Sequence, residues 1–152
     1  MFLITLIKAL SQHKVRYAVA GGYAVSLHGA VRTTFDVDLV VSLDEKNLQR
    51  LESALNGLHL QSRLPISASD VFNFRTEYIA KRNMIAWSFV NTADPSQLVD
   101  VIIAEDLRSL RTSSVVVLGT RIPILSIDSL VAMKKKSGRP QDIEDISALE
   151  RL

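Results

Sequence analysis

The 152-residue chain contains 47% hydrophobic and 22% charged residues, has a formal net charge of +2 and has no cysteine. This composition excludes intrinsic disorder, disulfides and thiolate metal sites, and no apolar run approaches the roughly 18 residues that span a bilayer. The length fits one domain, so we expect residues 1–152 to form a single unit with one core. The small net charge does not by itself indicate a nucleic-acid partner. We expect a cytoplasmic protein without a membrane partner, which the absence of cysteine fits.

Turn residues and hydrophobic periodicity divide the first part of the chain into alternating helices and strands. The opening MFLITLIKAL includes Lys8 and is not followed by a small-residue cleavage site, so it predicts an amphipathic helix rather than a signal peptide. Gly29 stands where a helix can end, and Asp44 where one can be capped. The predicted elements are a helix over 2–13, a strand over 17–20, a helix over 23–28, a strand over 35–41 and a helix over 44–56.

The second part of the chain predicts two hairpins and two final helices. Residues 61–83 contain Arg63, Pro65 and a Ser/Asp cluster, which predict mainly loop with a helical turn at 77–82. The later elements are strands over 87–90 and 98–103, strands over 115–118 and 122–125, and helices over 128–137 and 140–152, the last with Pro140 in its first turn. This order predicts an α+β fold, in which helices flank a mixed twisted sheet and two more helices follow it.

Two aspartates lie two residues apart in the strand predicted over 35–41. Because strand side chains alternate between faces, Asp36 and Asp38 are expected on one face, with Val37 and Leu39 on the other. Neighbouring carboxylates repel each other, and a hard divalent cation such as Mg²⁺ or Mn²⁺ would compensate their charge with oxygen ligands. The alternative is a pair of solvated acids at the start of a strand.

Two further features have the residue types of a phosphate and metal site. Gly21-Gly22 follows a short strand and precedes a helix, where backbone N–H groups can approach phosphate; the alternative is a tight turn that needs glycine. Asp100 stands in the apolar run LVDVII, where burial is costly without a cation; the alternative is a solvent-facing position. If its strand adjoins that of Asp38, three carboxylates converge, as in two-metal phosphoryl transfer, with Asp100 nearest the attacking hydroxyl.

The order of these motifs resembles the nucleotidyltransferase superfamily that includes DNA polymerase beta. That family has a Gly-Gly or Gly-Ser turn, then D-x-D, then a third Asp on a later strand. The chain looks most like the bacterial AbiEii-type abortive-infection and toxin–antitoxin nucleotidyltransferases, in which a His-Gly helix end and R-x-T-x-D-x-D follow. Here these are His28-Gly29 and the stretch from Arg32 to Asp38. The end SIDSLVAMKKKSGRPQDIEDISAL resembles that group's Lys-containing helix and G-R-x-x-D-x-x-D; residues 57 to 85 match loosely.

The resemblance implies a nucleotidyltransferase fold and a metal-dependent enzyme that moves a nucleoside monophosphate from ATP or another NTP to an acceptor hydroxyl. The acceptor would be the 3′ end of tRNA or a partner protein in a toxin–antitoxin pair. Asp36, Asp38 and Asp100 would be catalytic and would bind Mg²⁺ or Mn²⁺. The alternative is a non-catalytic nucleotide- or partner-binding module that retains the fold. The groups expected at the nucleotide are Gly21, Gly22, Arg32, Thr34, Lys134 and Arg139, although Arg32 and Thr34 could instead fill the turn before the strand.

The final helix places acids on its predicted inward face. Asp142 and Asp145 fall within the apolar arc of Ile143, Ile146, Leu149 and Leu152, so they need cationic partners. The candidates are Arg139, Lys134 and Arg32, which would make the two acids supporting residues of the site. The alternative for Asp142 is a favourable position at the start of a helix dipole.

Three other polar features are expected to be structural. His28 is predicted to pack or cap rather than act as a base. Lys134-Lys135-Lys136 cannot all face one way on a helix, so at most one or two serve the site. Lys81 and Arg82 are expected on a solvated face.

Overall fold

A seven-stranded mixed sheet runs through the centre of the computed structural model, which describes residues 1–152. The strand order is β3-β4-β5-β2-β1-β7-β6, in which β2–β5 and β1–β7 pair in parallel and the other neighbours are antiparallel. The strands are β1 (Tyr17–Ala20), β2 (Val37–Val41), β3 (Gln61–Ser62), β4 (Ala86–Asn91), β5 (Asp94–Ile102), β6 (Thr112–Val117) and β7 (Thr120–Leu125).

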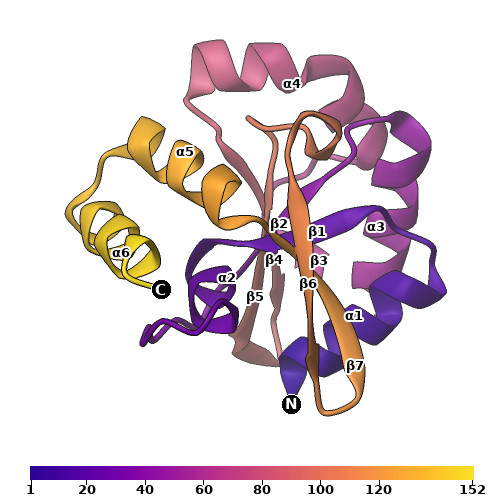
Figure 1. The fold of residues 1–152 in the computed structure, drawn as a ribbon. Helices are drawn as coiled ribbons and strands as arrows, with labels where there is room; N and C mark the ends of the chain where they lie inside the picture. Colours follow the sequence, from indigo (N-terminus) through magenta and orange to yellow (C-terminus); the bar gives the residue numbers. More distant parts are fainter.

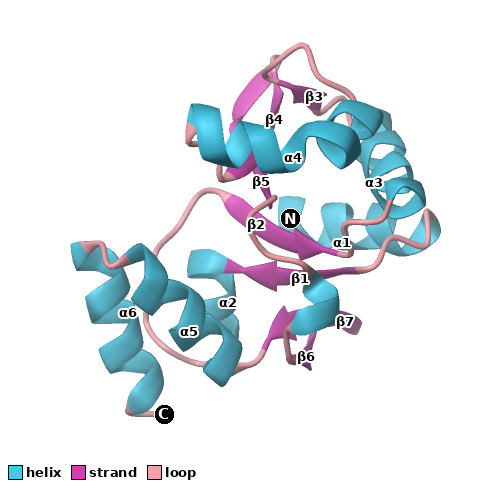
Figure 2. Ribbon diagram, turned by 90° about the horizontal axis from the view of Figure 1, so that it is seen from above, coloured by secondary structure: helices cyan, strands magenta, loops and turns pink.

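Helices cover both sides of this sheet. Figure 1 and Figure 2 show α1 and α3 on one side and α2, α5 and α6 on the other, and α4 packs beside α3. Their bounds are α1 (Phe2–Gln12), α2 (Gly21–Leu27), α3 (Glu45–Gly57), α4 (Ala68–Arg82), α5 (Ile127–Ser137) and α6 (Pro140–Glu150), with a 3₁₀ turn η1 at Leu107–Ser109. The predicted α+β class is therefore confirmed. None of these helices has the length and apolarity that a membrane span requires.

The core lies mainly between the sheet and α1, α3 and α4. Alternate residues of β4 and β5, including Trp87, Phe89 and Val99, are fully buried, as are Leu6 of α1 and Leu51 of α3. The residues between them, such as the polar ones of β4 and β5, therefore face the other side of the sheet. One face of β4 and β5 thus packs into the core, and their polar residues Ser88 and Asp100 lie on the opposite face.

Most predicted elements are present, with small shifts at their ends. Asp44 caps α3 by accepting the N–H of Asn47 at 2.9 Å, and Pro140 is the first residue of α6, as predicted. Both predicted hairpins form, and Leu118 and Gly119 turn between β6 and β7 with positive φ angles of 50° and 75°. Local turn and capping chemistry was sufficient to locate these features.

The prediction of mainly loop over residues 61–83 is wrong. The Ser/Asp cluster there is the start of α4: Asp70 N–H donates to Ser67 Oγ at 3.2 Å, and Ser67 N–H donates to Asp70 Oδ2 at 2.9 Å. Only Ala68 and Val71 of α4 are fully buried, so the helix lacks the apolar stripe that would have revealed it. Its capping box was the available signal.

Candidate functional site

Two of the predicted acids lie side by side in the centre of the sheet. Asp38 of β2 and Asp100 of β5 are register partners in a parallel pair. Val37 and Leu39 are completely buried, which turns Asp38 to the opposite, less covered face of β2. The assumption that the Asp100 strand adjoins the Asp38 strand is therefore confirmed.

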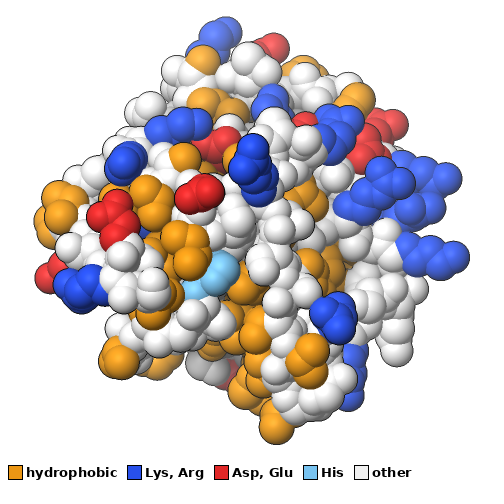
Figure 3. Space-filling model, viewed as in Figure 1, with side chains coloured by type: hydrophobic (Ala, Val, Ile, Leu, Met, Phe, Trp, Pro, Cys, Tyr) orange, Lys and Arg blue, Asp and Glu red, His pale blue; other side chains and the backbone are white.

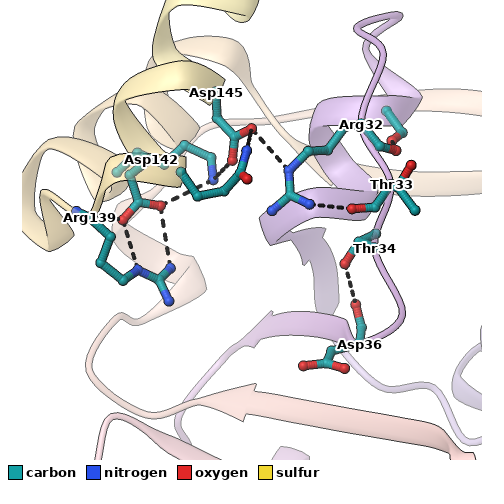
Figure 4. Close-up of polar contacts among 10 residues, drawn as sticks. Arg32, Thr33, Thr34, Asp36, Arg139, Asp142 and Asp145 are labelled. Atoms are coloured by element: carbon teal, nitrogen blue, oxygen red, sulfur yellow. Dashed lines mark hydrogen bonds and ion pairs between the residues drawn. The ribbon is translucent and has the colours of Figure 1, made fainter.

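Asp36 is placed differently from the prediction. β2 begins at Val37 rather than at residue 35, so Asp36 lies in an exposed bend just before the strand. The predicted start of the strand at residue 35 is therefore wrong, and strand alternation does not determine the direction of the Asp36 side chain. The backbone carbonyl of Asp36 instead accepts a long hydrogen bond of 3.5 Å from Thr34 Oγ1 (Figure 4).

The three acids nevertheless influence one another electrostatically. Burial, together with the negative charges of Asp100 and Asp36, raises the pKa of Asp38 to about 7 against the opposing charges of Lys134 and Arg139. A raised carboxyl pKa means that the ionised form lacks compensation where it stands. Asp38 is therefore the point at which additional positive charge would be most favourable.

Ser88 is a member of this group that the sequence analysis missed. It lies opposite Asp100 in the β4–β5 hairpin and donates its hydroxyl hydrogen to Asp100 Oδ1 at 2.6 Å. The hydrogen bond fixes the carboxylate of Asp100 on the open face of the sheet. Alternation in the run AWSFV, in which Trp87 and Phe89 point inward, was the signal that could have placed Ser88 beside Asp100.

The two glycines are required by contacts within the chain. Gly21 has φ +60°, and a Cβ there would lie 1.9 Å from Asp38 Oδ2. A Cβ on Gly22 would lie 2.8 Å from Thr34 Cβ. The pair forms the first turn of α2 rather than the end of a strand, and its lack of side chains is what lets β1 and α2 approach Asp38 and Thr34 this closely.

The donor set of the acidic group suits a hard cation. It offers only carboxylate and hydroxyl oxygens, with no sulfur, and the excess negative charge at Asp38 is what a divalent cation would neutralise. As the side chains stand, no three acids, histidines or cysteines are close enough to enclose an ion. The chemistry of the donors therefore fits Mg²⁺ or Mn²⁺, whereas a closed coordination shell is not preformed.

A second polar cluster joins α5 to α6. Lys134 is 7% exposed, and its Nζ lies 2.8 Å from Asp145 Oδ2 and 3.6 Å from Asp142 Oδ1. Arg139 Nε contacts Asp142 Oδ2 at 2.9 Å, and Arg32 Nε contacts Asp145 Oδ1 at 3.0 Å (Figure 4). The three predicted partners of the buried acids are therefore the observed ones, and Gln141, which was not predicted, also donates to Asp145 at 3.1 Å.

The predicted apolar arc of the last helix is wrong for two of its residues. Ile143 is 62% exposed and Leu152 is 58% exposed, whereas Asp142 and Asp145 are 1% and 2% exposed. Helix α6 is therefore rotated so that its acids, rather than Ile143, face α5. The ion pairs with Lys134 favour this orientation because they satisfy both buried carboxylates.

Charge compensation in this cluster gives the opposite pKa shifts from those at Asp38. Burial acts to raise the pKa of Asp142, but hydrogen bonds from Arg139 and Ser137 and the charge of Arg139 bring it down to about 2. Burial also acts to raise the pKa of Asp145. Hydrogen bonds from Lys134 and Gln141 and the charges of Lys134 and Arg32 outweigh it and hold this pKa below its usual value. Both acids are therefore held ionised.

Arg32 connects the two polar groups. Besides Asp145, its guanidinium donates to the carbonyl of Thr33, while its own carbonyl accepts the hydroxyl of Ser26 at 2.7 Å. The bend that carries Asp36 is thereby fastened to α2 at one side and to α6 at the other (Figure 4). Displacing α6 would consequently displace the residues that lead into β2.

The remaining candidates have structural environments. His28 Nε2 lies 2.7 Å from the carbonyl of Leu125, as expected for a packed histidine. Lys135 is exposed, Lys136 pairs with Glu105 at 3.0 Å, and Lys81 and Arg82 are exposed at the end of α4. Of the three consecutive lysines, Lys134 alone faces the site.

Comparison with known proteins supports the fold. No family model matches the chain, and no curated protein matches it in sequence. Among solved structures, the lincosamide antibiotic adenylyltransferase LnuA is 12% identical with a TM-score of 0.67, covering 98% of this chain and 94% of its own. The antibiotic-resistance factor ANT(2″)-Ia is also 12% identical with a TM-score of 0.67, over 97% of this chain and 80% of its own.

A third similar structure also covers nearly the whole chain. The antigenic nucleotidyltransferase-like protein from Paracoccidioides brasiliensis is 19% identical with a TM-score of 0.59, over 97% of this chain and 74% of its own. At these identities the likeness concerns the fold, so the chain has a nucleotidyltransferase-like fold. The matches do not single out the AbiEii-type group.

Proposed function

We propose that this protein transfers a nucleoside monophosphate from a nucleoside triphosphate to an acceptor hydroxyl, with Mg²⁺ or Mn²⁺ as cofactor. The observation that supports this most is the adjacency of Asp38 and Asp100, with Asp36 close enough to contribute to a pKa of about 7 at Asp38. Such a concentration of negative charge costs stability and is useful where a bound cation neutralises it. The nucleotidyltransferase-like fold of the chain is consistent with this use.

The metal ligands in this proposal are Asp36, Asp38 and Asp100. Exposed Asp36 would complete a group whose other two members already lie side by side on β2 and β5. When bound, the metal supplies charge neutralisation for the triphosphate and for the attacking oxygen. Ser88 holds the carboxylate of Asp100 ready for that role.

Cationic groups next to the acids would receive the triphosphate. The charges of Lys134 and Arg139 reach Asp38, and the guanidinium of Arg139 is exposed although its Nε is held by Asp142. Gly21 and Gly22 contribute backbone N–H groups at the start of α2, and Arg32 and Thr34 border them. In this account Lys134 acts mainly through its ion pairs with Asp142 and Asp145, because it is buried between them.

The reaction in this proposal is a single in-line displacement. The acceptor oxygen forms a bond to the α-phosphorus, the bond to the leaving pyrophosphate breaks, and the hydroxyl proton passes to a nearby base. Asp100 lies nearest the attacking hydroxyl, and one of its carboxylate oxygens can accept that proton. The carboxylates would position the metal, and none of them forms a covalent intermediate.

Three classes of molecule are candidates for the acceptor hydroxyl. The family resemblance implies the 3′ end of tRNA or a side chain of a partner toxin or antitoxin protein. The neighbour LnuA is named as a lincosamide antibiotic adenylyltransferase and was solved with lincomycin bound, which adds an antibiotic as the third class. We further propose that residues 1–152 act as one domain in this reaction.

Transfer of label tests the proposal directly. The protein is incubated with Mg²⁺ and each α-³²P-labelled triphosphate, in separate reactions with total tRNA, cell-protein extract and aminoglycoside or lincosamide antibiotics. We expect label in one acceptor class with wild-type protein and its loss in Asp38→Asn and Asp100→Asn. Absence of label in every reaction, or equal label with the Asp38→Asn variant, contradicts the proposal.

The alternative is a nucleotide-binding module without turnover. It is favoured by one observation, namely that no three acidic side chains already enclose an ion. Calorimetry with Mg²⁺ and ATP separates the two functions, because tight binding without pyrophosphate release indicates the module. Pyrophosphate release indicates the enzyme.

A further inference from the structure

A basic pocket lies at the end of the β1–β2 pair that is remote from Asp38. Ala20, the last residue of β1, is the register partner of Asp38, whereas Arg16 directly precedes the other end of β1. The pocket has a volume of about 430 Å³ and no hydrophobic residue lines it. Its lining residues are Arg16, Asp44, Lys46, Asn47, Arg50 and Arg108.

Buried Asn47 fixes the backbone that brings these cations together. Its Oδ1 accepts the N–H of Arg16 at 2.8 Å, and its Nδ2 donates to the carbonyl of Arg16 at 3.0 Å and to that of Ser42 at 2.9 Å. Asn47 is 3% exposed, so these bonds are shielded from water. The residue before β1 is thereby fastened to the first turn of α3, which carries Lys46 and leads to Arg50.

Three of the four cations have no ionic partner. Arg16, Lys46 and Arg50 are absent from the ion pairs of the protein. Lys46 and Arg50 are four residues apart on α3, so they share a face and repel each other. The one acid lining the pocket, Asp44, is engaged in capping α3. The pocket therefore holds an excess of positive charge that an anionic ligand would neutralise.

The fourth cation is held in a fixed orientation. Asp106 accepts hydrogen bonds from Arg108 Nη2 at 2.6 Å and from Arg108 Nε at 3.1 Å. A guanidinium has five N–H donors, so donors remain that can bind a further oxygen atom. Arg108 is therefore oriented by its acid partner without being fully used by it.

The lining indicates the chemistry of the ligand. Guanidinium and ammonium groups match the oxygens of phosphate, and the absence of apolar or aromatic residues leaves no surface for a base or sugar ring to stack on. We propose that this pocket binds a phosphate group, either one in the backbone of a single-stranded nucleic acid or a free phosphate ion. Figure 3 shows Lys and Arg side chains gathered on the side of the molecule where α3 begins, on the right of the view.

This inference is independent of the proposed function. None of the pocket residues belongs to the acidic group or to the α5–α6 cluster. A protein without transferase activity could still bind phosphate here, and a transferase could lack this site. The two proposals can therefore fail separately.

The test compares two variants of equal charge. The pocket variant is Arg16→Gln/Lys46→Gln/Arg50→Gln. The control is Arg121→Gln/Arg151→Gln/Lys135→Gln, whose three residues are exposed and lie outside the pocket. Fluorescence anisotropy measures binding of labelled single-stranded RNA at increasing KCl concentrations, and calorimetry measures binding of inorganic phosphate. Circular dichroism shows whether both variants remain folded.

We expect the pocket variant to lose affinity for RNA, for phosphate or for both by about tenfold or more, with a flatter salt dependence, because fewer phosphates are neutralised. The control variant should stay within about twofold of wild type. On wild-type protein, phosphate or RNA should shift the amide NMR signals of Lys46, Arg50 and Arg108, whatever the variants do. Equal losses in both variants, or no binding of either ligand by wild type, overturn the proposal.

Discussion

The two clusters of acidic residues in this protein have opposite electrostatic environments. At the sheet, Asp38 lies beside Asp100 and near Asp36, and its pKa is raised to about 7. Between α5 and α6, Asp142 is buried against Arg139 and Lys134, and its pKa is lowered to about 2. Burial acts to raise the pKa of both acids. They differ because Asp142 accepts hydrogen bonds directly from Arg139, whereas Asp38 has two carboxylates as neighbours. The first group is a place for an added cation, whereas the second holds the structure around it.

The largest expected effect on stability comes from removing Lys134, the cation shared by Asp142 and Asp145. Lys134→Ala leaves Asp142 and Asp145 buried without their shared partner, so the free energy of unfolding should fall by about 3–5 kcal/mol in urea denaturation. Lys135→Ala, at the exposed neighbouring position, should change it by less than about 0.5 kcal/mol. Equal effects of the two substitutions would mean that the ion pairs do not hold α5 to α6.

Adding a cation to the uncompensated group should have the opposite effect on stability. Mg²⁺ at about 100 times its dissociation constant should raise the free energy of unfolding by about 2.7 kcal/mol, because it binds the folded state. Differential scanning fluorimetry with Mg²⁺ and with K⁺ at matched ionic strength measures the change. The increase should disappear in Asp38→Asn, and its persistence there would place the metal elsewhere.

Neutralising one acid in each group should change stability in opposite directions near pH 8. Asp38→Asn should raise the free energy of unfolding by roughly 1–3 kcal/mol without metal, because it removes a poorly compensated charge. Asp142→Asn should lower it by a similar amount, because a compensated charge is lost. Urea denaturation of both variants gives the two signs, and a shared sign would contradict the comparison.

The same groups predict how stability depends on pH. The raised pKa of Asp38 contributes stability that is present below its unfolded value of 3.8 and is lost as pH rises through about 7. The lowered pKa of Asp142 contributes stability that is present above 3.8 and is lost as pH falls toward about 2. The difference in unfolding free energy between wild type and Asp38→Asn should therefore shrink as pH falls from about 8 to 5.

The smallest effect is expected at Ser88. Ser88→Ala removes the hydrogen bond to Asp100 and should cost about 1 kcal/mol of unfolding free energy, with a lower transfer rate if Asp100 works as proposed. Ser96→Ala provides the control, because its hydroxyl bonds Asp94 at the exposed hairpin end. Equal effects of the two substitutions on transfer would show that Ser88 does not position Asp100.

Much of this comparison could be predicted from the sequence, because caps, turns and alternation are local. These local patterns located most helices and strands. They also led to the expectations that the Asp100 strand adjoins the Asp38 strand and that Asp142 and Asp145 pair with three cationic residues. The rest depends on contacts that are distant along the chain. The hydrogen bond between Ser88 and Asp100 depends on the register of the β4–β5 hairpin. The ion pairs with Lys134 determine the rotation of α6 that exposes Ile143. The exposed helix α4 carried too little apolar periodicity to be recognised.

The pKa of the Asp38 carboxyl, measured by carbon-detected NMR with and without Mg²⁺, tests the central claim most directly. The account predicts a value of about 7 without metal and a marked decrease when Mg²⁺ is added, while the Asp142 carboxyl stays low in both conditions. A pKa for Asp38 near 3.8 without metal, or one that Mg²⁺ leaves unchanged, would contradict it.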